Sequence, residues 1–341
     1  MDKGKLPICI FLDLSKAFDT IDHSILLEKL TYYGVKNSPA NLFKSYLEDR
    51  KQYVEFDDIE SDMLSITTGV PQGSILGPLL FIIYLNDIAY ASKMFELILY
   101  ADDSTLSTTL NSFNININAD INDDINAELI KITDWLNANK LSLNVTKTKF
   151  MVFHQPRKKF KMPNLKLNDF QIENVDTFNF LGITIDKHLN WNAHIDKVCN
   201  KISRSLGIMN KLKNMLPITA KIKIYNSLIL SHLNYGILVW GYKCSRILKL
   251  QKRAVRIISC KKYNAHTSPL FKNLKLLKID DIFSISKVKF YHKFVNNKLP
   301  ENLQKLPLKL NQDTHRYATR RSGHIYRPKF NHSYAKKLCQ D

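Results

Sequence analysis

The sequence is poor in cysteine, and the few cysteines it has are scattered. Five occur in 341 residues, with no Cys-x-x-Cys pair among them: Cys9, Cys199, Cys244, Cys260 and Cys339. An odd number of isolated thiols argues against a disulfide framework and against a zinc site built from paired cysteines. We therefore expect reduced thiols in an intracellular protein that is not secreted.

The sequence also lacks the long apolar run of a signal peptide or a membrane span. Lys3 and Lys5 are followed only by a strand's worth of apolar residues, Ile8 to Leu12, which does not make a signal peptide. Residues 222–240 form the most apolar helical stretch, and four polar residues interrupt it: Lys223, Asn226, His232 and Asn234. This pattern is typical of a core helix, so we predict no membrane partner.

Positive charge is scarce in the first half of the chain and abundant in the second. Residues 1–150 hold 13 Lys and Arg against 21 Asp and Glu, a net charge of −8, whereas residues 151–341 hold 37 against 10, a net charge of +27. This asymmetry favours a carboxylate site next to a surface that binds polyanions. Lys-rich helices that are merely solvated are the weaker alternative. The length predicts about two domains.

No Lys or Arg lies between Lys93 and Lys131, yet this stretch contains two adjacent carboxylates. The apolar run Leu97–Tyr100 has strand character and leads directly to Asp102 and Asp103. Two carboxylates about 4 Å apart repel by roughly 4 kcal/mol at an effective dielectric near 20. The pair is either a solvated turn after a core strand, the commoner fate of such a pair, or part of a metal site.

A second apolar strand, Leu6–Asp13, also delivers a carboxylate at its end. Residues 68–78 then contain three glycines and two prolines. Such a loop lets a flat ligand approach the backbone and favours anions at the start of the helix expected at 79–86, although a plain strand-to-helix connection would look the same. Between these motifs we expect two helices and a hairpin, at residues 23–33, 39–49 and 52–67.

Taken together, five motifs resemble, in order and spacing, those of the palm of reverse transcriptases. They are Asp13 with Phe18, Gly-Val-Pro-Gln-Gly-Ser at 69–74, Tyr-Ala-Asp-Asp at 100–103, Leu-Asn-Val-Thr-Lys-Thr-Lys at 143–149 and Phe-Leu-Gly-Ile at 180–183. The amino-acid sequences of residues 13–23 and 69–78 resemble those of a non-LTR (LINE-type, jockey-like) retrotransposon polymerase. The motifs cover residues 5–187, and the likeness continues more diffusely to about 330.

The resemblance implies an α+β fold, with a right-hand palm in which helices cover an antiparallel sheet, followed by an all-α, basic, thumb-like domain. We expect the palm with partial fingers at residues 1–187, the helical nucleic-acid-binding domain at 188–300 and a basic, aromatic tail at 301–341. In the helical part, apolar stripes predict helices at 195–212, 218–240 and 245–259.

The resemblance also implies the chemistry. Two Mg²⁺ ions, or Mn²⁺ in their place, would be held by Asp13 and Asp102 with Asp103 beside them. Either Lys147 or Lys149 would be the general acid for the leaving pyrophosphate, and an ordinary surface lysine is the alternative for each.

Binding residues follow from the same likeness. Phe18, Gln72 and Gly73 would contact the nucleotide, although a core position for Phe18 is the alternative, and Phe180, Leu181 and Gly182 would form the primer grip. Phosphates would bind a basic helix face, where a solvated helix is equally compatible: Lys249, Lys252, Arg253 and Arg256. Asp19 and Asp22 are expected to be structural, through turn and cap interactions before the helix at His23.

The resemblance thus implies an RNA-directed DNA polymerase of the nucleus and cytoplasm. Such an enzyme uses an RNA template, a DNA primer and dNTPs. The sequence leaves the oligomeric state open. The chain begins close to Asp13, so we expect an N-terminally truncated copy or a fragment that lacks the first fingers strands. The alternative from another class is a non-catalytic remnant that binds nucleic acid. A phosphodiesterase ranks low because no His or Glu ligands lie near the carboxylates.

Overall fold

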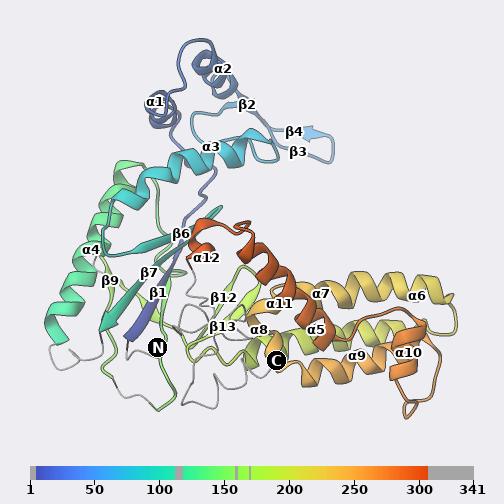
Figure 1. The fold of residues 1–341 in the computed structure, drawn as a ribbon. Coiled ribbons are helices and arrows are strands. Elements are labelled where there is room, and N and C mark those ends of the chain that lie inside the picture. The colour runs from blue at the N-terminus through green and yellow to red at the C-terminus, as the bar shows by residue number, and fades with distance from the viewer. Residues whose placement is uncertain (1–4, 112–117, 158–159, 169, 306–341) are drawn as a thin grey trace. The chain divides into compact units, whose positions relative to one another are not determined.

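The computed structural model describes residues 5–111, 118–157, 160–168 and 170–305 (Figure 1). These described residues fall into two compact units, the first within residues 5–178 together with 186–189 and the second within residues 179–185 together with 190–305. Most of the predicted tail at 301–341 lies outside the described residues. No helix in the described ranges combines the length and the apolarity that crossing a membrane requires.

The first unit is built on a five-stranded sheet with the strand order β11-β8-β1-β7-β6. The central strand β1 (Lys5–Asp13) pairs antiparallel with both β7 (Asp103–Asn111) and β8 (Lys149–Val152). On the outer sides, β6 (Glu96–Tyr100) runs antiparallel to β7, and the short β11 (Glu173–Asn174) runs parallel to β8. A separate ribbon joins β9 (Lys166–Leu167) and β10 (Phe170–Gln171).

Alternation along β1 gives the sheet one fully buried face. Four side chains of this strand enter the core on that face: Leu6, Ile8, Ile10 and Leu12. The helix α4 (Asn118–Ala138) contributes a stripe at helical spacing to the same core: Ile125, Leu129, Ile132 and Leu136. Each of these side chains stabilises the fold by about 1.5–3 kcal/mol when fully buried. The side chain of Asp13 leaves β1 on the opposite face of the sheet and is half-buried.

Three helices lie between β1 and β6, namely α1 (His23–Tyr32), α2 (Ser38–Leu47) and α3 (Leu76–Leu85). Asp22 caps α1 by accepting hydrogen bonds from the backbone N–H groups of Ser24 and Ile25 at 2.9 and 3.1 Å, as predicted. The expected hairpin is also present, as four two-residue strands: β2 (Lys51–Gln52), β3 (Glu55–Phe56), β4 (Ile59–Glu60) and β5 (Leu64–Ser65).

Helix α3 begins three residues earlier than predicted. The Ser74 hydroxyl accepts the Gly77 N–H at 2.9 Å, which satisfies a free donor at the start of the helix. Pro78 falls in the first turn, where its missing N–H removes no helical hydrogen bond. Proline therefore lies inside the helix, and a short 3-10 turn, Asn86–Tyr90, follows its end.

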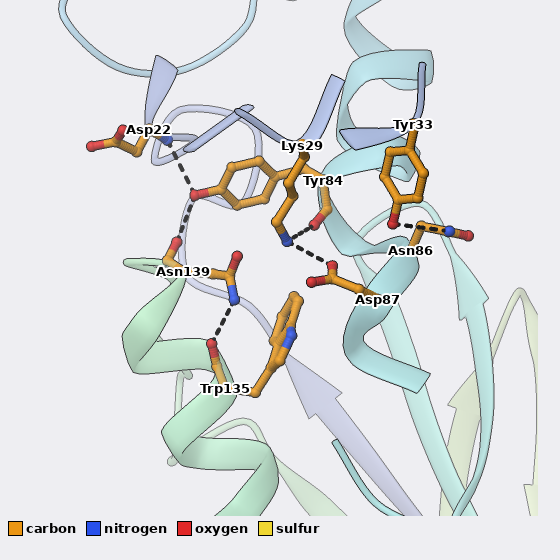
Figure 2. Close-up of polar contacts among 8 residues, drawn as sticks. All are labelled: Asp22, Lys29, Tyr33, Tyr84, Asn86, Asp87, Trp135 and Asn139. Atoms are coloured by element: carbon orange, nitrogen blue, oxygen red, sulfur yellow. Dashed lines mark hydrogen bonds and ion pairs between the residues drawn. The ribbon is translucent and has the colours of Figure 1, made fainter. Parts of the chain in front are cut away.

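Helices α1, α3 and α4 meet at a polar network around the half-buried Lys29 (Figure 2). The Lys29 ammonium donates to the Tyr84 carbonyl at 2.7 Å and to the Asp87 carboxylate at 2.6 Å, and it lies 4.7 Å from the centre of the Trp135 ring. The Tyr84 hydroxyl donates to the Asn139 carbonyl at 2.7 Å. Burial lowers the pKa of Lys29, and the ion pair with Asp87 opposes this effect. The network therefore ties α1 and α3 to α4.

The second unit is mostly helical and begins with residues 179–185, which are the tip of the hairpin formed by β12 (Thr177–Phe180) and β13 (Ile183–Asp186). The predicted stripe on α5 (Asn192–Lys211) is confirmed, since five of its members are buried: Ile195, Val198, Ile202, Leu206 and Met209. The predicted helix at 245–259 is α9 (Ser245–Ile258). Three further helices follow: α10 (Ser268–Asn273), α11 (Ile279–Val295) and α12 (Glu301–Gln304).

The prediction of one continuous helix over residues 218–240 is wrong. The stretch consists of α6 (Ile218–Tyr225), a π-helical turn (Asn226–Leu230), α7 (Ser231–Asn234) and α8 (Ile237–Trp240). Gly236 breaks it with a left-handed φ of +63°. A β-carbon at this position would also overlap the end of the Ile183 side chain, which would have to move to make room for it.

Candidate active site

Two of the predicted catalytic carboxylates face each other across the central strand pair. Asp13 is the last residue of β1 and Asp103 the first of β7, and the ladder pairs them directly. Side chains of directly paired residues leave the sheet on the same face, with β-carbons about 5 Å apart. Asp102 lies in the tight turn between β6 and β7, whose other residue, Ala101, has a positive φ of +51°. The fold thus brings all three carboxylates to one end of the sheet.

Electrostatics confirms that these carboxylates interact. Burial, followed by the negative charges of Asp102 and Asp13, raises the pKa of Asp103 above its usual range. The Lys147 ammonium approaches Asp13 Oδ2 at 3.7 Å, with the two side chains 69% and 40% exposed. An ion pair this exposed compensates little charge. The site therefore carries an excess of negative charge that a further cation would relieve.

The predicted lysines have different surroundings. Lys147 follows a turn in which Asn144 donates its N–H to the Asp13 carbonyl at 2.8 Å and accepts the Lys147 N–H at 3.1 Å. Lys149 is on β8, and its ammonium bonds the Glu173 carboxylate of β11 at 2.5 Å. The structure thus brings the Lys147 ammonium close to Asp13 and pairs the Lys149 ammonium with Glu173. Asn144 anchors this arrangement through its backbone, a role that its residue type alone does not reveal.

The glycine-rich loop docks onto the turn that follows β1. Gly69 and Val70 donate their N–H groups to the carbonyls of Ile21 and Phe18 at 2.7 and 2.9 Å. Gly69 has a φ of +86°, and a β-carbon there would come within 2.9 Å of the backbone of Asp19. The sequence motif therefore has a structural reason to contain glycine at this position.

The predicted nucleotide-binding residues lie along this loop and turn. The Gln72 amide donates to the Asp19 carboxylate at 2.8 Å, which gives Asp19 the structural role expected of it. Gly73 is exposed and has a φ of +82°. The Phe18 ring is half-buried and stacks on Phe81 with centroids 4.4 Å apart. Phe18 thus packs against the core and also borders the loop.

The donor set fits a divalent ion only in part. Among the described residues, no group of three or more His, Cys, Asp or Glu side chains is arranged as a metal cage. Mg²⁺ usually takes one or two carboxylates from a protein and completes its shell with water and substrate phosphates. Asp13, Asp102 and Asp103 match this requirement in chemistry and in their uncompensated charge. They fit a site that the substrate completes.

In the second unit, the predicted primer-grip residues form the tip of the β12–β13 hairpin. Phe180 ends β12, and Leu181 and Gly182 turn the chain with φ angles of +47° and +78°. The Tyr235 hydroxyl donates to the Leu181 carbonyl at 2.5 Å, which fixes the tip to the segment before α8.

The four predicted phosphate-binding residues share one face of α9, opposite a buried face that includes Val255 and Ile258. Lys249 and Arg253 are exposed and Lys252 is half-buried. Arg256 instead uses its Nε to donate to the Ala265 carbonyl at 2.9 Å, so part of its hydrogen-bonding capacity is taken by the chain itself.

Similarity to known proteins extends over most of the sequence. The family model "Reverse transcriptase (RNA-dependent DNA polymerase)" matches residues 1–185. The RNA-directed DNA polymerase from mobile element jockey of Drosophila melanogaster is 27% identical over 298 residues, which are 82% of this chain and 31% of that protein. The probable RNA-directed DNA polymerase from transposon BS of the same organism is 28% identical over 295 residues, 81% of this chain and 31% of that protein.

The chain therefore spans less than a third of the length of these two relatives. Among solved structures, apo telomerase from Candida tropicalis aligns with a TM-score of 0.41 at 13% identity, covering 74% of this chain and 42% of that one.

Proposed function

Because this chain belongs to the reverse transcriptase family, we propose that it acts as the polymerase core of a jockey-like non-LTR retrotransposon. It would extend a DNA primer from its 3′-hydroxyl with dNTPs, copying an RNA template. The observation that carries this proposal is the direct pairing of Asp13 with Asp103 at the sheet end where Asp102 also lies. In this proposal the first unit is the palm with partial fingers, and the helices of the second unit are the thumb.

Asp13 and Asp102, with Asp103 beside them, would hold two Mg²⁺ ions, or Mn²⁺. When bound, such ions stabilise the charge that develops on the attacking and leaving oxygens. The direction of the Asp103 pKa is consistent with this assignment, because burial raises it first and the negative charges of Asp102 and Asp13 raise it further.

Lys147 is the better candidate for the general acid. Its ammonium is exposed, lies 3.7 Å from Asp13 and so can release a proton to a leaving group at the site, whereas Lys149 is paired with Glu173. A lysine ammonium beside the leaving group can act as a general acid by donating its proton late in the reaction.

The loop and turn after β1 would bind the incoming nucleotide. Gly73 offers exposed backbone, the Gln72 amide lies at the loop surface, and the Phe18 ring is a flat wall held in place by Phe81. Phe180, Leu181 and Gly182 would contact the primer, and Lys249, Lys252 and Arg253 would bind phosphates, with a smaller share for Arg256.

The test is primer extension by the full chain on poly(rA)/oligo(dT) with Mg²⁺. Asp102→Asn keeps the shape of the side chain but removes a charged ligand, and we expect extension to fall to background. Asp58→Asn is the matched control, because Asp58 also lies in a hairpin turn, is exposed and has a φ of +62°, which asparagine tolerates.

Extension by the native chain and the Asp58 variant, but not by the Asp102 variant, would support the proposal. If none of the three extends the primer while all bind the duplex with equal, salt-sensitive affinity, the polymerase assignment fails for this chain. The non-catalytic nucleic-acid-binding remnant then takes its place.

A further inference from the structure

A thiol and a buried ammonium meet in the second unit, where α9 packs against α5 and α6 (Figure 1). Cys260 comes two residues after the end of α9 and is exposed. Lys221 of α6 is only 4% exposed, and its ammonium donates to the Cys260 thiol at 3.2 Å. Both groups also donate to the Lys213 carbonyl, the ammonium at 2.9 Å and the thiol at 3.5 Å. One carbonyl, one thiol and one ammonium thus form a small polar cluster.

The Lys221 ammonium has no carboxylate partner in the described part of the chain. No Asp or Glu occurs in residues 197–279, and none of the described ion pairs involves Lys221. A buried charge is costly unless an opposite charge and hydrogen bonds compensate it. The Lys213 carbonyl stays neutral, whereas the Cys260 thiol can lose its proton. A Cys260 thiolate would therefore complete an ion pair with Lys221.

The neighbouring end of α9 acts in the opposite direction. The C-terminal end of a helix carries about half a unit of negative charge, which disfavours a nearby anion. Because the Lys221 ammonium carries a full charge and is in hydrogen-bonding contact with the sulfur, its effect exceeds that of the helix end. Removal of this one ammonium should leave Cys260 in surroundings that disfavour a thiolate.

The other described thiols have different surroundings. Cys199 and Cys244 are buried and Cys9 is half-buried. Burial raises the pKa of all three, that of Cys9 to about 11 and that of Cys244 to about 12. A disulfide is attacked by a thiolate, and the attacking sulfur must be accessible. Among the residues that the structure describes, Cys260 is therefore the cysteine best suited to this attack.

The sequence around Cys260 favours a reagent with negative charge. Lys261 and Lys262 follow the cysteine directly and are exposed. The carboxylate-free stretch 197–279 includes all three segments that form the cluster. A surface of one charge sign raises the local concentration of reagents of the opposite sign.

We propose that Cys260 is a covalent modification site for small anionic disulfides, with the Lys221 ammonium stabilising the attacking thiolate. Cys260 gives up its proton to water, and its sulfur attacks one sulfur of the disulfide. The S–S bond of the reagent breaks, and a new S–S bond forms to Cys260. The other half of the reagent leaves as a thiolate and takes up a proton, so the disulfide is itself the oxidant. This proposal does not depend on the polymerase function proposed above.

The test exposes the native full chain to oxidised glutathione, a disulfide that carries carboxylates, at neutral pH. N-ethylmaleimide blocks the remaining thiols at timed intervals, and mass spectrometry of peptides gives the mixed-disulfide fraction at each cysteine. We expect Cys260 to react about tenfold faster than Cys9, Cys199 or Cys244. A rate at Cys260 no higher than at these three would overturn the proposal.

Two lysine variants separate the contact from the net charge. Lys221→Met removes the ammonium and retains a long side chain, and we expect modification of Cys260 to slow by about fivefold. Lys223→Met is the matched control, because Lys223 is exposed on the same helix and makes none of the described hydrogen bonds to the thiol. Its rate should stay within about twofold of the native rate. Equal slowing in the two variants would overturn the role of Lys221.

A neutral reagent, hydroxyethyl disulfide, supplies a measurement that needs no variant and so holds even if Lys221→Met fails to fold. For each reagent, the rate at Cys260 in the native chain is divided by the rate in the urea-unfolded chain. We expect both ratios to exceed unity and the ratio for oxidised glutathione to be the larger. Ratios of unity or less would overturn the thiolate assignment, and equal ratios above unity would overturn the preference for anions.

Discussion

At the scale of residues, the two lysines of the 143–149 motif show how a neighbour in space decides a role. Lys147 and Lys149 are separated by a single residue, yet one lies 3.7 Å from Asp13 and the other bonds Glu173. The strand position of Lys149 pairs it with Phe11, two residues before Asp13. The two lysines therefore have different ion-pair partners in the structure, although the sequence motif does not distinguish them.

We expect Lys147→Gln to lower the rate of nucleotide addition by about a hundredfold, the smaller end of what a general acid contributes. Lys149→Gln should change it by no more than several-fold, because its ammonium is engaged with Glu173. Single-turnover primer extension at saturating dNTP measures both. Neither change should alter the free energy of unfolding by more than about 1 kcal/mol, since both ion pairs are partly exposed.

The reverse order, with Lys149→Gln the slower enzyme, would assign the acid to Lys149. Equal rates for both variants and the native chain would leave neither lysine with a chemical role. A urea titration of each variant separates these outcomes from partial unfolding.

The residue scale also shows what the sequence can and cannot predict. Asp13 and Asp103 were identifiable because each is next to an apolar strand, and strand ends are a local property of the chain. Whether Asp13 would pair with Asp103 or with Asp102 depended on the register between β1 and β7, which are about ninety residues apart. The partner of Lys149 depended on β11, a two-residue strand with no periodic signal of its own.

At the scale of elements, periodicity predicted the helices that bury one face. The stripes of α5 and α9 repeat at helical spacing, so both helices were found from the sequence. The break in the 218–240 stretch was missed because a single glycine inside an apolar helical pattern is usually tolerated. Only the packing of Ile183 against Gly236 shows that this glycine ends a helix.

Gly236 and Gly207 therefore make a matched pair for one test. Gly236→Ala should lower the free energy of unfolding by about 2–4 kcal/mol, because it combines a left-handed backbone with overlap against Ile183. Gly207 lies in α5, is exposed, and would bring its β-carbon into open space, so Gly207→Ala should raise stability by about 0.5–1 kcal/mol.

Urea unfolding followed by circular dichroism measures both changes. A Gly236→Ala protein as stable as the native chain would mean that residues 231–240 can form one continuous helix. In that case the fixed position of Tyr235 against the hairpin tip would also be lost as a structural constraint.

At the scale of the whole molecule, the two halves of the chain differ in the sign of their net charge. The acidic first half contains Asp13, Asp102 and Asp103, and the basic second half contains the exposed basic face of α9. Composition could not predict that Lys221 would be buried beside Cys260, because the two residues meet only through the packing of α6 against α9. It also gave no sign of the buried ionisable groups.

Those buried groups set the pH range in which the protein is stable. Burial lowers the pKa of His154, His194 and His232 below the ordinary value of 6.5, so below pH 6.5 the unfolded chain binds more protons than the native one. Stability is therefore fully present above pH 6.5 and is lost as the pH falls. Burial raises the pKa of Cys9 from 9.0 to about 11 and that of Cys244 to about 12. Their contribution is fully present below pH 9.0 and is lost as the pH rises through these values.

We thus expect the urea midpoint to be highest between about pH 7 and 9 and to fall on both sides. Measurements at about pH 5.5, 8 and 10.5 at constant ionic strength test this shape. Cys9→Val, which removes one thiol at nearly constant volume, should reduce the alkaline loss and leave the acid side unchanged. A midpoint at pH 5.5 that equals or exceeds the one at pH 8 would contradict the histidine assignment. Such a result would mean that the imidazoles become protonated within the native fold without destabilising it.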